Sequence, residues 1–354
     1  MAIRDKKSCA SSTQLRLMRK RWVHSDKDRV LLSILNLNRF DMKKVFFSLT
    51  FLLLLFCLCA CTNNNSSKSK QNGVPVIPEV KSIFINGDST HYIDVGKGDP
   101  VVFVHGALGD YRTWEAQMDT FALHHRVISY SRRLSYPNNQ IDNDSIDVTF
   151  GAQAKDLAEL IKALNLGRVH LVGHSAGGSI TLLTTIEHPE LVRSLVLVEA
   201  DLESLMKNAP HADSILNSLY ITIIKPATDG FNSNNDRKAV SAFVNGVTGD
   251  SLYFNNLSQR IQDNMITNVV ETKHNLLYET PSPHVTCDDL SKIKVPVLVL
   301  TGEKSLSFFT LISDELYRCL TNREKATIMN ATHGLEFEKP SEFNKIVLGF
   351  LDRH

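Results

Sequence analysis

Apolar residues are grouped along this chain in short runs that alternate with longer segments of helical spacing. Two early runs, 81–86 and 90–95, alternate apolar with polar positions, which is typical of half-exposed antiparallel strands. The run at 100–104 is continuously apolar, as central strands of a parallel sheet are. Further runs interpreted as strands cover 125–131, 169–172, 194–199, 295–302 and 325–330.

Segments with apolar residues at helical spacing separate these strands. Strands that alternate with helices predict an α/β fold, with a mostly parallel central sheet and helices on both faces. The alternation stops over about residues 202–290, so we predict a helical cap there, inserted after the sixth core strand at the edge where ligand clefts form. The polar loop 132–147 is interpreted as a surface connection. The expected helices cover 114–123, 149–166, 176–188 and 341–351, and Asp147 or Thr149 is expected to cap the second.

The N-terminal part differs from the rest in its pattern. From Met42, a short basic start and an apolar run lead to Leu58-Cys59-Ala60-Cys61, which is typical of a bacterial secretory signal. Its end resembles a lipobox, which implies diacylation of Cys61 and a membrane-anchored lipoprotein of the cell envelope, facing the periplasm or cell surface; an uncleaved anchor is the alternative. The expected divisions are an over-extended start at 1–41, a signal peptide at 42–60, a flexible tether at 61–79 and the folded domain at 80–354.

Charge and cysteine content narrow the function further. A formal net charge of +1 gives no electrostatic case for a nucleic-acid partner. Only Cys287 and Cys319 fall in the expected folded domain, so no metal-ligand spacing is present and we expect neither a metal nor a cofactor. Whether these two cysteines pair depends on the redox compartment and on their separation, which the sequence leaves open.

The candidate chemistry begins where the apolar run ending at Val172 meets Gly173-His174-Ser175-Ala176-Gly177. In a Gly-x-Ser-x-Gly turn between a strand and a helix, the serine adopts strained backbone angles, and the glycines allow the two elements to approach closely. The helix N-terminus favours developing negative charge. We therefore predict that Ser175 is a nucleophile.

A serine hydroxyl needs a base that takes its proton and an acid that orients the base. Among thirteen histidines, His333 directly follows the last predicted strand and precedes the last helix, so it is the predicted base. The Gly-rich turn after 100–104 leaves backbone N–H groups free. Ala107 and Ala176 are the expected oxyanion-hole donors.

The acid is less constrained by the sequence. Its commonest position lies about three residues after the strand at 295–302, where this chain has Ser305, which cannot hold an imidazolium. Glu199 closes the apolar run before the predicted cap, and a carboxylate there is costly to bury unless it is paired. We therefore predict Glu199 as the acid, with Glu303 and Asp201 as alternatives.

Together these motifs resemble the α/β-hydrolase fold family over about residues 80–354. The segments 105–114 and 129–137 resemble a bacterial subgroup related to pimeloyl-carrier-protein methyl ester esterases. Glu199 follows Ser175 at a spacing similar to that of haloalkane dehalogenases, but those enzymes use an aspartate nucleophile, so Ser175 argues against dehalogenase or epoxide hydrolase chemistry. The resemblance implies a serine hydrolase that cleaves a small-molecule ester or thioester. A carbon–carbon bond hydrolase and a catalytically silent ligand-binding protein remain alternatives.

Overall fold

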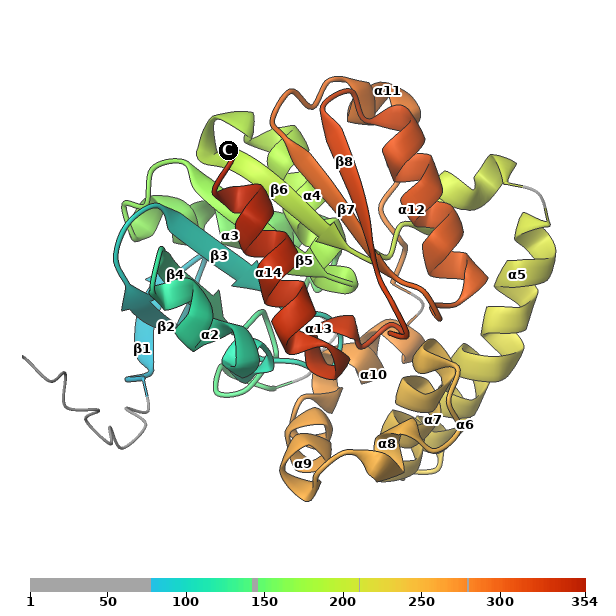
Figure 1. Ribbon diagram of the computed structural model, residues 1–354. Coiled ribbons are helices and arrows are strands. Elements are labelled where there is room, and N and C mark those ends of the chain that lie inside the picture. Colours follow the sequence, from blue (N-terminus) through green and yellow to red (C-terminus); the bar gives the residue numbers. More distant parts are fainter. Residues whose placement is uncertain (1–77, 142–145, 210, 279) are drawn as a thin grey trace, which may run out of the picture. The chain divides into compact units, whose positions relative to one another are not determined.

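The computed structural model describes residues 78–141, 146–209, 211–278 and 280–354. Its centre is an eight-stranded sheet in the order β1-β2-β4-β3-β5-β6-β7-β8 (Figure 1). β2 pairs antiparallel with β1 and β4, and all other neighbours are parallel, which confirms the predicted fold class. The proposed signal peptide and Cys61 lie outside the described residues. The strands are β1 (Lys81–Ile85), β2 (Asp88–Gly96), β3 (Pro100–Val104), β4 (Arg126–Tyr130), β5 (Val169–His174), β6 (Val192–Val198), β7 (Val297–Gly302) and β8 (Arg323–Ile328).

Helices cover both faces of the sheet because side chains alternate along its central strands. In β3, Val101 and Phe103 belong to a buried cluster with residues of α2 and α14, whereas Val102 and Val104 belong to a second cluster with residues of α3, α4 and α12. Thr149 caps α3 as predicted, by accepting a hydrogen bond from the N–H of Ala152. The helices of the two layers are α2 (Glu115–Ala122), α3 (Phe150–Ala163), α4 (Ala176–Glu187), α12 (Ser307–Cys319), α13 (Leu335–Glu338) and α14 (Pro340–Leu351), with short turns η1 (Tyr111–Trp114) and η2 (Pro189–Leu191).

Between β6 and β7 the chain forms a group of helices beyond the carboxyl ends of the central strands (Figure 1). This cap has its own apolar cluster, in which Phe231, Val240 and Phe254 are buried together with Leu108 of the β3–η1 turn. The cap therefore packs directly on the loops that follow the parallel strands. Its elements are η3 (Glu203–Asn208), α5 (Ala212–Leu219), η4 (Tyr220–Ile224), α6 (Lys225–Asn232), α7 (Asp236–Thr248), α8 (Tyr253–Asn256), α9 (Gln259–Thr267) and α10 (Val269–Leu277). The last helix before β7, α11 (Cys287–Ser291), lies apart from them beside α12 (Figure 1).

Two features differ from the sequence-based predictions. The loop that begins at Arg132 is not wholly a surface connection, because the Arg132 side chain is 1% exposed and pairs with Glu271 of α10. Helix α12, which was not predicted, fills the interval between β7 and β8 and buries Phe308, Phe309 and Ile312.

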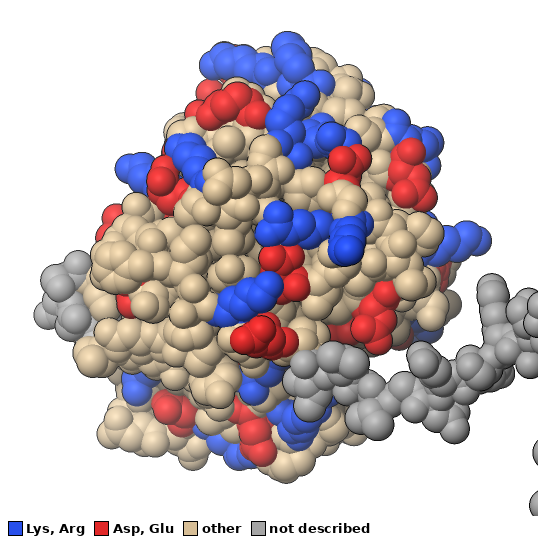
Figure 2. Space-filling view, turned by 90° about the vertical axis from the view of Figure 1, so that its left-hand side faces the viewer, with Lys and Arg blue, Asp and Glu red and all other residues tan. Residues whose placement is uncertain are grey.

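The surface carries both signs of charge. On the face shown in Figure 2, Lys and Arg side chains are interspersed with Asp and Glu side chains. Within the residues that the structure describes, no helix is long and apolar enough to cross a membrane.

Candidate active site

The nucleophile turn joins β5 to α4 in a strained conformation. Ser175 has φ 53° and ψ −123°, a region that residues with a Cβ rarely occupy, and its N–H donates to the carbonyl of Val198 at 2.9 Å. The two glycines of the motif are required by packing. A Cβ on Gly173 would overlap the carbonyl of Gly177, and a Cβ on Gly177 would overlap the carbonyl of Val104. This close packing holds Ser175 at the N-terminus of α4.

His333 lies in the loop between β8 and α13 and is 5% exposed. Its Nδ1 lies 2.7 Å from Oε2 of Glu199, and its ring is stacked on Phe309 with centroids 3.8 Å apart and planes 12° apart. With Nδ1 engaged by the carboxylate, Nε2 is the nitrogen left to exchange a proton with Ser175. Phe309 belongs to α12, so the helix that was not predicted from the sequence packs against one face of the His333 ring.

Glu199 directly follows β6 and is fully buried. Its φ of 47° turns the chain away from the strand direction. Besides contacting His333, the carboxylate accepts a hydrogen bond from the N–H of Gly302 at 2.7 Å through Oε1, which also accepts one from the Ser305 hydroxyl. A carboxylate is costly to bury unless such donors satisfy its oxygens. Ser305, at the position where an aspartate was expected, therefore holds the acid supplied by the neighbouring strand.

Neither alternative acid forms a hydrogen bond or ion pair with His333 in the described part of the chain. Glu303 is exposed and accepts a hydrogen bond from the N–H of Asn330 at 2.8 Å. The main-chain oxygen of Asp201 accepts a hydrogen bond from the Ser179 hydroxyl at 2.6 Å. Burial raises the pKa of Asp201 to about 6. Of the three candidates, Glu199 is the one that hydrogen-bonds to the imidazole.

The turn after β3 is held from inside the protein. Nδ1 of the buried His105 donates to the carbonyl of Gly106 at 2.8 Å, and Nε2 accepts the N–H of Arg132 at 3.1 Å. Burial lowers the pKa of His105 well below its ordinary value, which favours this neutral form. Nη2 of Arg132 donates to the same Gly106 carbonyl at 2.9 Å, and its Nη1 lies 2.6 Å from Glu271. Arg132 thus links the cap to the turn that carries Ala107.

Comparison with known proteins places this geometry in a family. Residues 99–340 match the model of the alpha/beta hydrolase fold. The chain belongs to the α/β-hydrolase fold family.

Named relatives of this α/β-hydrolase differ in their substrates. It is 24% identical over 280 residues to (E)-2-((N-methylformamido)methylene)succinate hydrolase of Acinetobacter baylyi, covering 75% of this chain and 95% of that protein. It is 25% identical over 289 residues to 2-hydroxy-6-oxo-6-(2'-aminophenyl)hexa-2,4-dienoic acid hydrolase of Metapseudomonas resinovorans, covering 76% and 90%. Carboxylesterase CesB of Bacillus subtilis shares the fold, with a TM-score of 0.58, 21% identity and coverage of 78% and 92%.

A cavity of about 640 Å³ in this hydrolase is lined by Ser175. Its floor includes Ala107, Ser175 and His333. Arg112 also lines it, but this cation is paired with the buried Asp110, so it adds little net charge. The surface of the cavity is mainly apolar, although the cap also contributes polar side chains such as Arg260 and Asn264. The apolar side chains from the cap are Phe243, Val244, Val247, Leu257, Ile261 and Met265.

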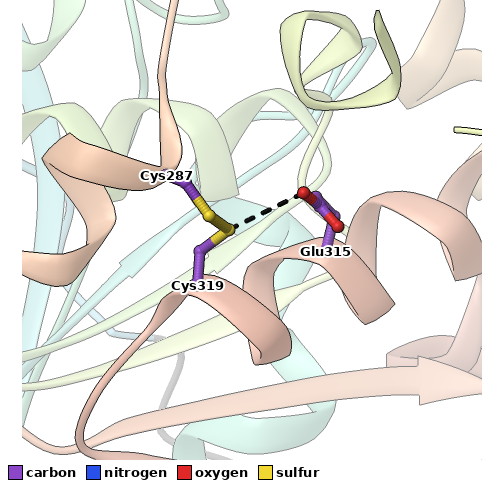
Figure 3. Close-up of side chains that lie close together, drawn as sticks. All are labelled: Cys287, Glu315 and Cys319. Atoms are coloured by element: carbon purple, nitrogen blue, oxygen red, sulfur yellow. Dashed lines mark hydrogen bonds between the residues drawn. A yellow bond between two sulfur atoms is a disulfide. The ribbon is translucent and has the colours of Figure 1, made fainter. Parts of the chain in front are cut away.

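Among the described residues, one cluster has metal-binding side chains at close range, and it lies apart from this cavity. It consists of Cys287, Glu315 and Cys319 (Figure 3). The two cysteines form a disulfide that joins α11 to α12, so neither offers the thiolate that a soft metal requires. The structure therefore answers the pairing question that the sequence left open.

Proposed function

We propose that this hydrolase cleaves a carboxylic ester or thioester through an acyl-enzyme on Ser175. The observation that carries the proposal is the 2.7 Å contact between Glu199 and Nδ1 of His333, in a site where His333 and Ser175 share one cavity. A carboxylate, an imidazole and a strained serine in these roles form the arrangement that activates a hydroxyl for acyl transfer.

Acylation uses each of these groups in turn. Nε2 of His333 takes the Ser175 proton as the oxygen attacks the substrate carbonyl, and Glu199 stabilises the imidazolium that results. The N–H groups of Ala107 and Ala176 donate to the oxyanion. One such donor contributes about 10² to 10³ in kcat. His333 then passes the proton to the leaving alcohol or thiol.

Deacylation repeats these steps with water as the attacking group. His333 takes a proton from the water that attacks the acyl carbonyl, and then returns one to Ser175 as the acid product leaves. The chemistry of this proposal requires no metal or organic cofactor, since every proton and electron pair is handled by substrate, water and the chain itself.

The cavity limits the substrate. Its mainly apolar surface favours an uncharged acyl or alkyl portion, because burying apolar surface contributes about 25 cal/mol per Å². From the sequence segments 105–114 and 129–137, we also propose that the chain belongs to the branch of pimeloyl-carrier-protein methyl ester esterase-like proteins.

Carbon–carbon bond hydrolysis is the second candidate. The relative from Metapseudomonas resinovorans is a dienoic acid hydrolase, and the same three side chains would serve a diketone substrate. A catalytically silent binding protein on this fold is a weaker candidate, because the strain at Ser175 and the buried Glu199 have no purpose in simple binding.

We also propose that the hydrolase is a lipoprotein of the bacterial cell envelope, anchored through Cys61. The support is the signal-like sequence from Met42 to Cys61, together with the disulfide between Cys287 and Cys319. Disulfides persist mainly in oxidising compartments outside the cytosol. To test this, cells that produce the protein are grown with a radioactive or clickable fatty acid. We expect the protein to incorporate the label, and Cys61→Ser to abolish this incorporation.

The direct test of the activity is turnover of a p-nitrophenyl ester series from acetate to decanoate, with Ser175→Ala alongside. We expect hydrolysis by the wild type, a loss of about 10³-fold or more in kcat for the variant, and a chain-length optimum that reflects the cavity. A chromogenic diketone separates the second candidate. No turnover of any substrate, with no labelling of Ser175 by a fluorophosphonate, would favour the binding protein.

A further inference from the structure

A second histidine, His174, contacts three parts of the site without joining the proton path. Its Nε2 lies 2.9 Å from the main-chain oxygen of His333, and the two rings have centroids 4.7 Å apart. It also packs on the oxyanion turn, since a Cβ on Gly106 would lie 3.1 Å from both its Nδ1 and the Cβ of Ser175. His174 thus contacts the predicted base, the turn of Ser175 and the turn that carries Ala107.

Glu336, in α13, is the side chain that meets the other nitrogen of this ring. It is fully buried, and its Oε1 lies 3.1 Å from Nδ1 of His174. Within the described part of the chain, neither carboxyl oxygen has a hydrogen-bonding side-chain partner other than this imidazole. An acid buried in this way is costly unless it is neutral or paired.

The hydrogen-bond pattern fixes where the protons lie. The main-chain oxygen of His333 can only accept, so Nε2 of His174 carries a hydrogen. Burial lowers the pKa of His174 well below its ordinary value, and burial raises that of Glu336 well above, with the negative charges of Glu199 and Glu338 acting in the same direction. Both directions favour a protonated Glu336 that donates to a neutral His174.

We propose that Glu336 is a positioning residue, which through His174 holds the main chain of His333 so that its imidazole stays aligned with Ser175. The hydrogen bonds run in one direction, from the Glu336 carboxyl to Nδ1 of His174, and from Nε2 of His174 to the His333 carbonyl. The same pair keeps positive charge away from the imidazolium that His333 becomes during acylation. This inference rests on the proposed function.

The test compares two replacements of Glu336 in the full chain, solubilised in detergent. Glu336→Met removes the donor with little change of volume, and we expect kcat to fall about 10- to 100-fold, as a small misalignment of reacting groups does. KM should stay within about twofold and thermal stability should be unchanged or raised, because an apolar side chain is cheaper to bury. Glu336→Gln keeps an N–H donor and should recover most of kcat. Glu342→Gln, on the exposed start of α14, is the matched control.

Two outcomes overturn the inference. Wild-type kcat in Glu336→Met shows that the carboxyl positions nothing. Equal losses of kcat in the Met and Gln variants, accompanied by lower thermal stability, show that Glu336 only supports the fold. If the wild type itself hydrolyses no ester, the proposed function fails instead, and the rate at which a fluorophosphonate labels Ser175 replaces kcat in the same comparison.

Discussion

Two glutamates follow neighbouring parallel strands of this hydrolase and have different surroundings. Glu199, after β6, is fully buried and contacts His333, the N–H of Gly302 and the Ser305 hydroxyl. Glu303, after β7, is exposed and accepts a hydrogen bond from the main chain of Asn330. The two carboxylates have the same chemistry and similar sequence contexts, yet only one can orient the imidazole.

The difference shows that strand ends are alternative places for the acid, and that the local donors decide which is used. A carboxylate can be buried at the end of β6 because three donors converge on it. One of them, Ser305, lies after β7 at the position where the acid of such a site is more often found. The residue at that position here donates to Glu199, the predicted acid after the preceding strand.

The largest expected effect comes from neutralising the buried member of the pair. Glu199→Gln keeps the shape of the side chain but removes the charge that stabilises the imidazolium, so kcat should fall by about 10³- to 10⁴-fold while the protein remains folded. Steady-state kinetics with the preferred p-nitrophenyl ester and a thermal melt measure this. Near-normal turnover would remove Glu199 from the mechanism.

The second effect concerns the support for that acid. Ser305→Ala deletes one hydrogen bond to Glu199 and leaves the other two, so we expect kcat to fall by about 3- to 10-fold, corresponding to about 1 kcal/mol. KM should change little, since Ser305 does not line the cavity. A loss as large as that of Glu199→Gln would mean that the serine itself contacts the reacting groups.

Asp201, which lies two residues after Glu199 at the end of β6, is expected to make the stability of the protein depend on pH. The pKa of Asp201 is about 6 in the folded protein, compared with an ordinary value of 3.8. As the pH rises between these values, the carboxyl group loses its proton in the unfolded chain but keeps it in the folded protein, so the free energy of unfolding falls. Asp201→Asn should therefore raise the free energy of unfolding at pH 8 by about 1 to 2 kcal/mol, with no gain near pH 3. Denaturant melts at both pH values measure this. A gain that is equal at both values would assign the effect to packing rather than ionisation.

The smallest effect is expected for the exposed glutamate. Glu303→Gln keeps an oxygen that can accept from Asn330, and its charge is screened by solvent, so kcat and KM should stay within about twofold of the wild type. Measured in the same assay, Glu303→Gln is the matched control for Glu199→Gln. A loss of orders of magnitude here would reverse the assignment of the acid.

Much of the fold could be predicted because its signals are local. The apolar runs of β3 and β5 and the glycines around Ser175 each carry a short-range cause, either burial on both faces of a sheet or close approach of backbones. The position of His333 followed from its place after the last strand. These positions could be predicted before any contact was known.

Other parts depend on contacts between segments that are distant in the chain. Arg132 lies in a polar stretch, and its burial results from Glu271, which the cap supplies 139 residues later. No local pattern distinguishes Glu336 from other charged residues, and its contact with His174 depends on where α13 places it. The cap pattern gave helices but not the shape of the cavity, because pocket walls form from side chains of several elements.

The measurement that tests the central claim most directly is the intact mass of the protein after rapid quenching of its reaction with a p-nitrophenyl ester. The account predicts a mass increase equal to the acyl group, located by peptide mapping on Ser175, and absent from Ser175→Ala. Ester turnover without any acyl adduct on Ser175, or with one on another residue, would contradict it.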